Sequence, residues 1–247
     1  MIDRIKTMYD SCGRIEHHYS HHPITQKIHN FKWNGNWESI ERFREVCGKF
    51  KIDDDKHTRK NNPNYKGDFH SHINELWYKD IKDGFKDGDK VVEIGAGWGE
   101  LGRIILDDYK IQYWVIDLPE CLVMTAKWLS ENRKDLKFKL YDEEGNSDDF
   151  DIILQPPWDF DLPKVDWFIN TRSFQEISKA GVDRYFDIIQ DKLNIGGLFL
   201  NVNRFAPMPL YYGVDNMPYD DNWITILDKP APYQEHKIKM LLKERCV

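Results

Sequence analysis

Two different patterns of hydrophobic and polar positions divide the chain near residue 85. Before that point the sequence is polar and rich in His and aromatic residues, with helix-like stretches such as NWESIERFREVCGKF. In that stretch Ile40, Phe43, Val46 and Phe50 recur at helical spacing. We therefore expect residues 1–85 to form a helical N-terminal cap. The charged stretch KIDDDKHTRKNNPNYKGD lacks apolar periodicity and predicts a loop. One function that such a loop can serve is that of a lid.

From Asp89 onward, short apolar runs alternate with amphipathic segments, which is typical of βαβ units and a parallel sheet. The predicted strands are KVVEIG, QYWVIDL, KFKLYDE or DIILQ, VDWFIN and GLFLNVN. The predicted helices between them are ELGRIILDDY, PECLVMTAKWLSENR and GVDRYFDIIQDKL. Two late strands, DNWITILDK and HKIKMLLKER, add an antiparallel edge. We expect residues 86–247 to form one α/β domain around a mostly parallel, Rossmann-like seven-stranded sheet.

The segment VVEIGAGWGELG predicts a cofactor-binding loop between a strand and a helix. Gly95, Gly97 and Gly99, with Ala96 between the first two, form the turn, because a side chain there blocks a tight turn and the close approach of backbone to ligand. Glu93 precedes the turn. An acid at that point pairs with the cationic amino-acid moiety of S-adenosylmethionine, whereas a pyrophosphate-binding loop disfavours it.

Asp117 ends the next predicted strand, twenty-two residues after Gly95. A carboxylate at that position reaches the ribose hydroxyls of a bound nucleoside. Leu118 and Pro119 follow it, and we expect them to border the adenine. Together these positions predict S-adenosylmethionine as the cofactor and S-adenosylhomocysteine as the product.

Two other enzyme classes share parts of these motifs. Gly97, Gly99 and Gly102 spell GxGxxG with an acid about twenty residues later, as in NAD(P)-dependent oxidoreductases. That fingerprint begins where the strand stops, but here two residues intervene, so a methyltransferase is favoured. The segment FDIILQPPWDF resembles the PPW motif of amino-methylating nucleic-acid enzymes, but it has Gln155 where those have Asp or Asn. We expect Gln155 to lie in a turn near the adenine.

Composition and charge restrict the classes of partner that we expect. The formal net charge is -7, which argues against nucleic acid, because phosphate contacts need a basic surface. The four cysteines are scattered and show no zinc-like spacing, and no apolar run approaches the roughly 20 residues needed to span a bilayer. We expect a cytoplasmic protein without a membrane span, acting on a small-molecule acceptor.

The segment VDWFINTRSFQEIS makes a family resemblance specific. Together with VVEIGAGWGELGRIIL, YWVIDLPECL and GLFLNVNR, it resembles the sugar O-methyltransferase family of antibiotic and surface-polysaccharide gene clusters. The resemblance covers roughly residues 90–204, and Ile177 stands where the family usually has Met. It implies a class I methyltransferase fold and a hydroxyl acceptor on a sugar, often nucleotide-linked or polymer-linked. A non-sugar oxygen, such as a phosphoramidate capsule modification, is the alternative acceptor within the same class.

The same segment carries the candidate catalytic residues. A strand that ends in Asn170, Arg172 and Ser173 delivers polar groups to the carboxyl edge of the sheet, where ligands of open α/β folds bind. We expect Asn170 to contact the cofactor and Arg172 and Ser173 to contact the acceptor. Glu176 is the first candidate for the general base, although a helix N-terminal acid without a catalytic role is equally consistent with its position.

His70 and His72 are further candidates for the base, because His titrates near neutral pH and this segment directly precedes the α/β core. Sugar faces stack on aromatic rings. Four aromatic residues in a long connection after the fifth strand are therefore candidates to line the acceptor pocket: Tyr211, Tyr212, Tyr219 and Trp223. We predict no metal, because SDDFD and YDDN are more typical of solvated turns than of ligand sets.

Overall fold

The structure, a computed structural model, describes residues 1–12, 33, 35–36, 39, 69–232 and 237–246. Its helices are α1 (Ile2–Ser11), α5 (Phe69–Ile81), α6 (Glu100–Asp108), α7 (Pro119–Asn132) and α8 (Lys179–Lys192). Its strands are β1 (Lys90–Ile94), β2 (Gln112–Ile116), β3 (Phe138–Lys139), β4 (Ile152–Gln155), β5 (Val165–Thr171), β6 (Leu193–Arg204), β7 (Trp223–Pro230) and β8 (Ile238–Arg245). Short 3₁₀ turns are η1 (Lys82–Gly84), η2 (Ser147–Asp149), η3 (Phe174–Glu176) and η4 (Val214–Asn216).

The strands form one sheet of eight in the order β3-β4-β2-β1-β5-β6-β8-β7. The six strands from β1 to β6 run parallel, and β8 pairs antiparallel with both β6 and β7. The predicted antiparallel edge is therefore confirmed. The sheet has eight strands rather than seven, because KFKLYDE and DIILQ, taken as alternatives, both supply a strand. The former supplies only the two-residue edge strand β3.

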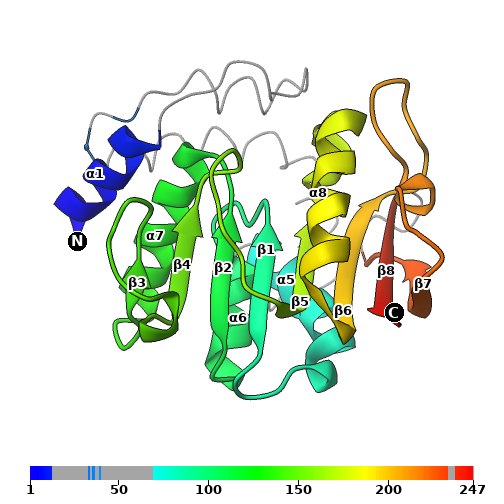
Figure 1. Cartoon of the computed structure of the whole chain (residues 1–247), viewed down its shortest axis with the longest axis horizontal. Helices are drawn as coiled ribbons and strands as arrows, with labels where there is room; N and C mark the ends of the chain where they lie inside the picture. Colours follow the sequence, from blue (N-terminus) through cyan, green and yellow to red (C-terminus); the bar gives the residue numbers. More distant parts are fainter. Residues whose placement is uncertain (13–32, 34, 37–38, 40–68, 233–236, 247) are drawn as a thin grey trace.

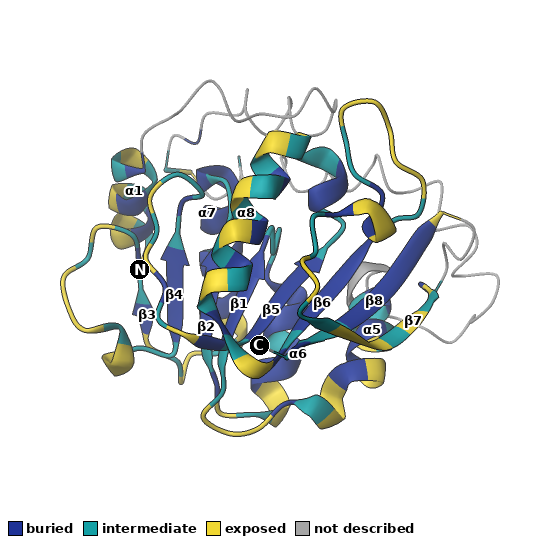
Figure 2. Ribbon diagram, turned by 45° about the vertical axis from the view of Figure 1, so that its right-hand side comes forward, coloured by how far each residue is buried: buried dark blue, intermediate teal, exposed yellow. Residues whose placement is uncertain are grey.

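Helices cover both faces of the sheet (Figure 1). Helices α5, α6 and α7 pack on one face, where their apolar side chains share a core with Val91, Tyr113 and Trp167. Helix α8 packs on the other face, through Val182 and Phe186. Figure 2 shows the central strands buried between these layers, whereas the edge strand β7 is largely exposed.

The chain order places a topological switch point beside β1. From β1 the chain proceeds to β2, β3 and β4 on one side, and then returns to β5 on the other side. Ligands of open α/β sheets bind outside the carboxyl ends of the strands at such a point. The loops that follow β1 and β5 therefore face the expected binding crevice.

The N-terminal part is described only in pieces. Helix α5 lies against the sheet and shares its core through Ile73, Trp77 and Ile81. Phe85 stacks on Trp167 with ring centroids 4.1 Å apart. The predicted helix at 36–50 and the predicted lid at 51–68 fall almost wholly outside the described residues, so the N-terminal cap and the boundary at residue 85 stay predictions.

Candidate functional site

The glycine loop after β1 has the conformation that the sequence predicts. Gly95, Gly97 and Gly99 have φ angles of 76°, 61° and 75°, a region that residues with a side chain rarely adopt. A Cβ added to Gly97 meets no atom of the described residues within 4 Å. A Cβ added to Gly95 comes within 2.3 Å of Ser173 Oγ, and one added to Gly99 within 2.8 Å of Thr125 Cγ2. Gly97 is therefore the glycine that leaves room for a ligand, whereas the other two pack against protein.

Asp117 connects this loop to the end of β2. One of its carboxylate oxygens accepts a hydrogen bond from the Gly97 N–H (2.8 Å), and the other accepts one from the Leu118 N–H (2.7 Å). Burial raises the pKa of Asp117 to about 6, while these backbone hydrogen bonds and one from Cys121 act in the opposite direction. Each oxygen keeps a further lone pair, which is what a ribose diol requires.

Glu93 lies beneath the loop and is 1% exposed. Burial raises its pKa to about 7, hydrogen bonds from the Tyr113 hydroxyl and Thr171 lower it, and the charge of Asp117 raises it further. A buried carboxyl with this pKa gains from a bound cation, because the cation stabilises the ionised form. The ammonium and sulfonium groups of S-adenosylmethionine supply such charge, so the acid, the ribose carboxylate and the open Gly97 fit this cofactor.

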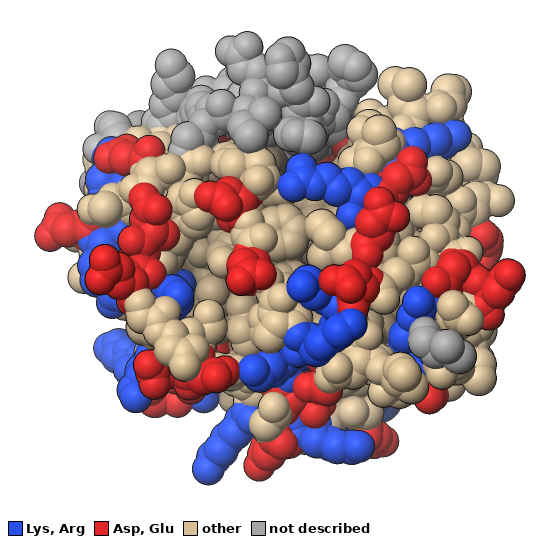
Figure 3. Space-filling model, viewed as in Figure 1, with Lys and Arg blue, Asp and Glu red and all other residues tan. Residues whose placement is uncertain are grey.

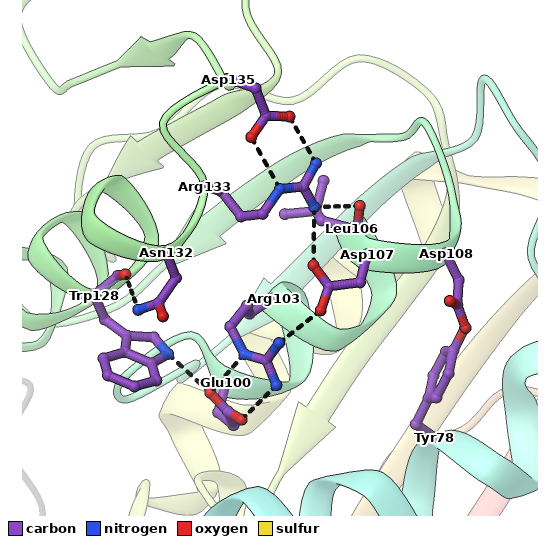
Figure 4. Close-up of polar contacts among 10 residues, drawn as sticks. All are labelled: Tyr78, Glu100, Arg103, Leu106, Asp107, Asp108, Trp128, Asn132, Arg133 and Asp135. Atoms are coloured by element: carbon purple, nitrogen blue, oxygen red, sulfur yellow. Dashed lines mark hydrogen bonds and ion pairs between the residues drawn. The ribbon is translucent and has the colours of Figure 1, made fainter.

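Glu100, the next acid along the chain, has a different role (Figure 4). Its carboxylate pairs with Arg103 (2.9 Å) and accepts a hydrogen bond from Trp128 Nε1 (2.8 Å). Arg103 in turn contacts Asp107 at 2.6 Å. These bonds attach the first turn of α6 to α7 and hold the helix that follows the glycine loop.

A network of buried amides shapes the loop that follows β5. Asn170 donates to the Ile94 carbonyl (2.9 Å), and its own amide oxygen accepts from Asn203 Nδ2 (2.8 Å). The Asn203 amide oxygen accepts the Gln175 N–H (3.1 Å). Asn170 is 0% exposed and bonded to protein groups, so the structure shows it positioning the loop. A direct contact between Asn170 and the cofactor stays a prediction.

Arg172, Ser173 and Glu176 occupy this loop. Ser173 Oγ donates to the Ile94 carbonyl (3.1 Å), which places the loop directly beside the glycine turn. Arg172 has a φ angle of 64°, and its backbone N–H bonds to Val202 O (2.7 Å). The charge of Glu176 raises the pKa of Asp117, so the two carboxylates lie in the same region. These three residues, which the sequence assigned to catalysis and acceptor binding, share one loop beside the glycine turn, and their roles stay predictions.

The two candidate histidines lie in the first turns of α5. Glu75 raises the pKa of Arg103 near the start of α6, and the Tyr78 hydroxyl donates to Asp108 (2.6 Å) at its end. Helix α5 therefore runs parallel to α6, and its N-terminus lies at the end of the sheet where the glycine loop is. His72 Nδ1 lies 3.8 Å from Glu75 Oε2. The side chain of His70 lies outside the described residues.

The aromatic residues of the β6–β7 connection separate into two groups. Tyr212 donates to Asp183 of α8 (2.8 Å), and Tyr211 pairs with Met208 in a tight hairpin. Trp223 pairs with Arg245, and the preceding Glu244 pairs with Leu198, which is level with Trp167 near the start of β5. Trp223 thus lies at the amino edge of the parallel strands, where it packs between Phe199 and Tyr219. The prediction that it lines the acceptor pocket does not fit this register.

Gln155 and Leu118 flank the expected adenine position. The Gln155 carbonyl at the end of β4 accepts the Asp117 N–H (3.3 Å), and its side-chain Oε1 is buried with no hydrogen-bond partner. Leu118 is the residue before α7 and packs against the core. The loop after Gln155 reaches α1, because Trp158 Nε1 donates to the Cys12 carbonyl (2.8 Å). Gln155 is the last residue of β4 rather than part of a turn, and the roles of Gln155 and Leu118 beside the adenine stay predictions.

Sequence reasoning missed three residues that support the site. Thr125 Oγ1 donates to the Gly97 carbonyl (3.0 Å), Cys121 bonds to Asp117, and Tyr113 bonds to Glu93. Thr125 and Cys121 lie on the first turns of α7, directly after Asp117. A helix that starts at a ligand-binding acid presents its first side chains to the same loop, which is the signal that identifies them.

Surface charge, the apolar character of the helices and the grouping of metal-binding side chains concern the partners that the protein binds. On the face that Figure 3 shows, Lys and Arg side chains are interspersed with Asp and Glu, without a continuous basic stripe among the described residues. In the described part of the chain, no helix combines the length and apolar character of a membrane span. Nor do the described residues include a group of three or more His, Cys, Asp or Glu able to hold a metal ion.

Solved structures share this fold. The pyocyanin biosynthetic protein PhzM is 12% identical with a TM-score of 0.52, and the match covers 74% of this chain and 63% of that one. The PH0226 protein from Pyrococcus horikoshii OT3 is 10% identical with a TM-score of 0.55, covering 74% and 93%. An S-adenosylmethionine-dependent methyltransferase from Clostridium acetobutylicum is 11% identical with a TM-score of 0.53, covering 79% and 99%.

This chain therefore spans less than two thirds of the length of PhzM. No curated protein matches it. A profile of the family described as mycolic acid cyclopropane synthetase matches residues 78–209, which is more than half of the chain. That range contains the glycine loop, Asp117 and the loop after β5. The chain belongs to the mycolic acid cyclopropane synthetase family, and it shares its fold with an S-adenosylmethionine-dependent methyltransferase.

Proposed function

We propose that this methyltransferase transfers the methyl group of S-adenosylmethionine to a hydroxyl group of a sugar. The sugar is a small or nucleotide-linked acceptor in bacterial surface-polysaccharide or glycoside biosynthesis, and the reaction takes place in the cytoplasm. The observation that carries this proposal is the loop after β5, where INTRSFQEIS lies directly against the glycine turn through Ser173 and Gly95. The segment that resembles the sugar O-methyltransferases thus borders the predicted methyl donor.

The cofactor contacts in this proposal come from three strand ends. Glu93 receives the ammonium group, the glycine loop from Gly95 to Gly99 with Ala96 lies along the amino-acid chain, and Asp117 accepts from the ribose hydroxyls. Leu118 and Gln155 border the adenine. An adenine amino group is a suitable donor for Gln155 Oε1, which is buried and has no partner in the described part of the protein.

The reaction is an in-line displacement at the methyl carbon. As the acceptor oxygen forms its bond to carbon, the carbon–sulfur bond breaks and its electron pair returns to sulfur, which becomes the neutral thioether of S-adenosylhomocysteine. The acceptor oxygen loses its proton to a base. Much of the acceleration comes from alignment of the two reactants, and proton removal adds roughly 10²- to 10⁴-fold.

Glu176 is our proposed base, with His72 and His70 as the next candidates. Glu176 lies in η3 one turn after Arg172 and Ser173, and its charge acts on Asp117. We propose that Arg172 and Ser173 orient the sugar and that Tyr211 and Tyr212 line the outer part of the acceptor pocket. A phosphoramidate-type oxygen is the alternative acceptor, since the same base and alignment serve any hydroxyl.

A methyl-transfer assay with labelled S-adenosylmethionine tests this proposal. Nucleotide sugars and simple glycosides are compared with phosphoramidate acceptors, and mass spectrometry locates the added methyl group. We expect transfer to a sugar oxygen. Glu176→Gln should lower kcat by at least about 10²-fold without changing the affinity for S-adenosylhomocysteine.

Glu144→Gln is the matched control, because this acid is exposed, and it should keep full activity. Transfer to phosphoramidates but to no sugar would overturn the acceptor class. Full activity of Glu176→Gln would remove Glu176 as the base, after which His72→Ala becomes the informative variant.

A further inference from the structure

Tyr113 and Glu93 form a buried pair that the chemistry of methyl transfer does not require. Tyr113 is 0% exposed and lies on β2 two residues before Val115, which is the register partner of Glu93 on β1. The two side chains are diagonal neighbours on the face that α6 covers. The Tyr113 hydroxyl donates a hydrogen bond to Glu93 Oε2.

Gly102 of α6 closes this arrangement from above. A Cβ on Gly102 comes within 2.3 Å of Tyr113 Cζ and 2.4 Å of its hydroxyl oxygen. Glycine at this position lets the helix pass directly over the phenol, which is fully buried. The pKa of Tyr113 is raised well above its usual value by burial and by the charge of Glu93, so the phenol stays protonated and acts as a donor.

We propose that Tyr113 is a positioning residue that favours the ionised form of Glu93 and aims its carboxylate at the ammonium group of the cofactor. This inference rests on the proposed role of Glu93 in cofactor binding. A buried carboxylate is stabilised by a charge-assisted hydrogen bond, and the neighbouring phenol is a fixed source of one. Cofactor binding thereby becomes linked to the release of a proton near neutral pH.

The groups that act on Glu93 come from two neighbouring strands and the turn after β2. Tyr113 of β2 and Thr171 of β5 donate hydrogen bonds and lower its pKa, whereas Asp117, after β2, raises it by charge repulsion. Asp117 itself has a pKa raised to about 6, so both acids can contribute to a pH profile. A ligand that lacks the amino-acid moiety distinguishes the contributions of the two acids to this profile, because it contacts Asp117 but not Glu93.

The experiment measures binding of S-adenosylhomocysteine and of methylthioadenosine by calorimetry between pH 6 and pH 9. For the wild-type protein, we expect the affinity for S-adenosylhomocysteine to fall as the pH drops below about 7, with proton release detected in buffers of different ionisation enthalpy. Tyr113→Phe should move this midpoint upward, so that affinity at pH 7 falls roughly tenfold and recovers near pH 9. Methylthioadenosine affinity should not change.

Two further variants test whether a folding defect explains the effect of Tyr113→Phe. Gly102→Ala keeps the phenol but displaces it and should move the midpoint in the same direction. Tyr78→Phe removes a similar phenol-to-carboxylate bond, to Asp108 at the far end of α6 (Figure 4), and should leave the profile unchanged. A loss of affinity in Tyr113→Phe that is uniform across pH, or equal for both ligands, would overturn the proposal. Failure of the wild-type protein to bind either ligand would instead refute the proposed cofactor site.

Discussion

At the scale of single residues, the site contains two acids in surroundings that oppose their charge. Burial raises the pKa of Glu93 to about 7 and that of Asp117 to about 6. An acid whose pKa is higher in the folded than in the unfolded chain binds more protons when folded. Its contribution to stability is therefore present at low pH and is lost as the pH rises from the unfolded pKa through the folded pKa. Ionisation of these buried acids therefore destabilises the free protein, and binding of a cationic ligand offsets that loss.

Glu93→Gln should consequently stabilise the free protein in a pH-dependent way. The wild-type acid is neutral at pH 5 and ionised at pH 8, whereas the amide is neutral at both. We expect the variant to gain on the order of 2–3 kcal/mol of unfolding free energy at pH 8 and little at pH 5, while its affinity for S-adenosylhomocysteine falls. Urea denaturation at the two pH values measures this, with Glu144→Gln as the exposed control. An equal change at both pH values would contradict it.

At the scale of elements, the loop between β1 and α6 is fixed by its neighbours on two sides. The loop after β5 contacts it through Ser173, and α7 contacts it through Thr125. The remaining side, at Gly97, is open in the described structure. The three glycines therefore serve different purposes despite similar backbone conformations.

Substitutions by Ala separate these purposes. Each introduces left-handed strain of about 1–2 kcal/mol. Gly97→Ala should add little further instability but lower the affinity for S-adenosylhomocysteine by at least about tenfold, because its methyl group points into the ligand space. Gly95→Ala should be less stable than Gly97→Ala, because the added methyl group displaces the side chain of Ser173. Calorimetry measures the affinity for S-adenosylhomocysteine, and thermal denaturation measures the stability of each variant.

Gly88→Ala is the matched control for strain, since Gly88 has a φ angle of 91°, lies before β1 and would place its Cβ in open space. It should lose stability but keep its affinity. If Gly97→Ala kept full affinity, the cofactor would not lie against this glycine.

Several elements could be predicted because their signals are local. Apolar runs predicted the central strands, and the glycines predicted the tight turn that follows β1. The location of Trp223 depends on the register of β7 against β8, which a sequence does not specify when both faces carry apolar residues. The contact between Tyr113 and Glu93 is likewise diagonal across two strands that lie 20 positions apart. The amide network of Asn170 could not be anticipated for the same reason.

At the scale of the whole molecule, the N-terminal helix is joined to the α/β core. Ile5 and Met8 of α1 are 0% and 1% exposed and belong to the same core as α7. Arg4 pairs with Glu143 (2.7 Å), and Trp158 holds the Cys12 carbonyl. Helix α1, which belongs to the predicted N-terminal cap, therefore contacts the protein beside the loop that follows Gln155.

Ile5→Ala tests whether α1 and the sheet unfold together. Truncation of a fully buried Ile costs about 2–5 kcal/mol, because apolar contacts are lost and a cavity remains. In a protein of this size that corresponds to roughly 5–15 °C in the melting temperature if the chain unfolds as one unit. Calorimetry should then show a single transition shifted downward, whereas Thr7→Ala on the exposed side of the same helix should leave it in place. A cap that folds independently would instead give a separate early transition, with the main transition and its response to S-adenosylhomocysteine unchanged. That outcome would support the predicted domain boundary near residue 85, since the packing of Ile5 would then stabilise only the N-terminal unit.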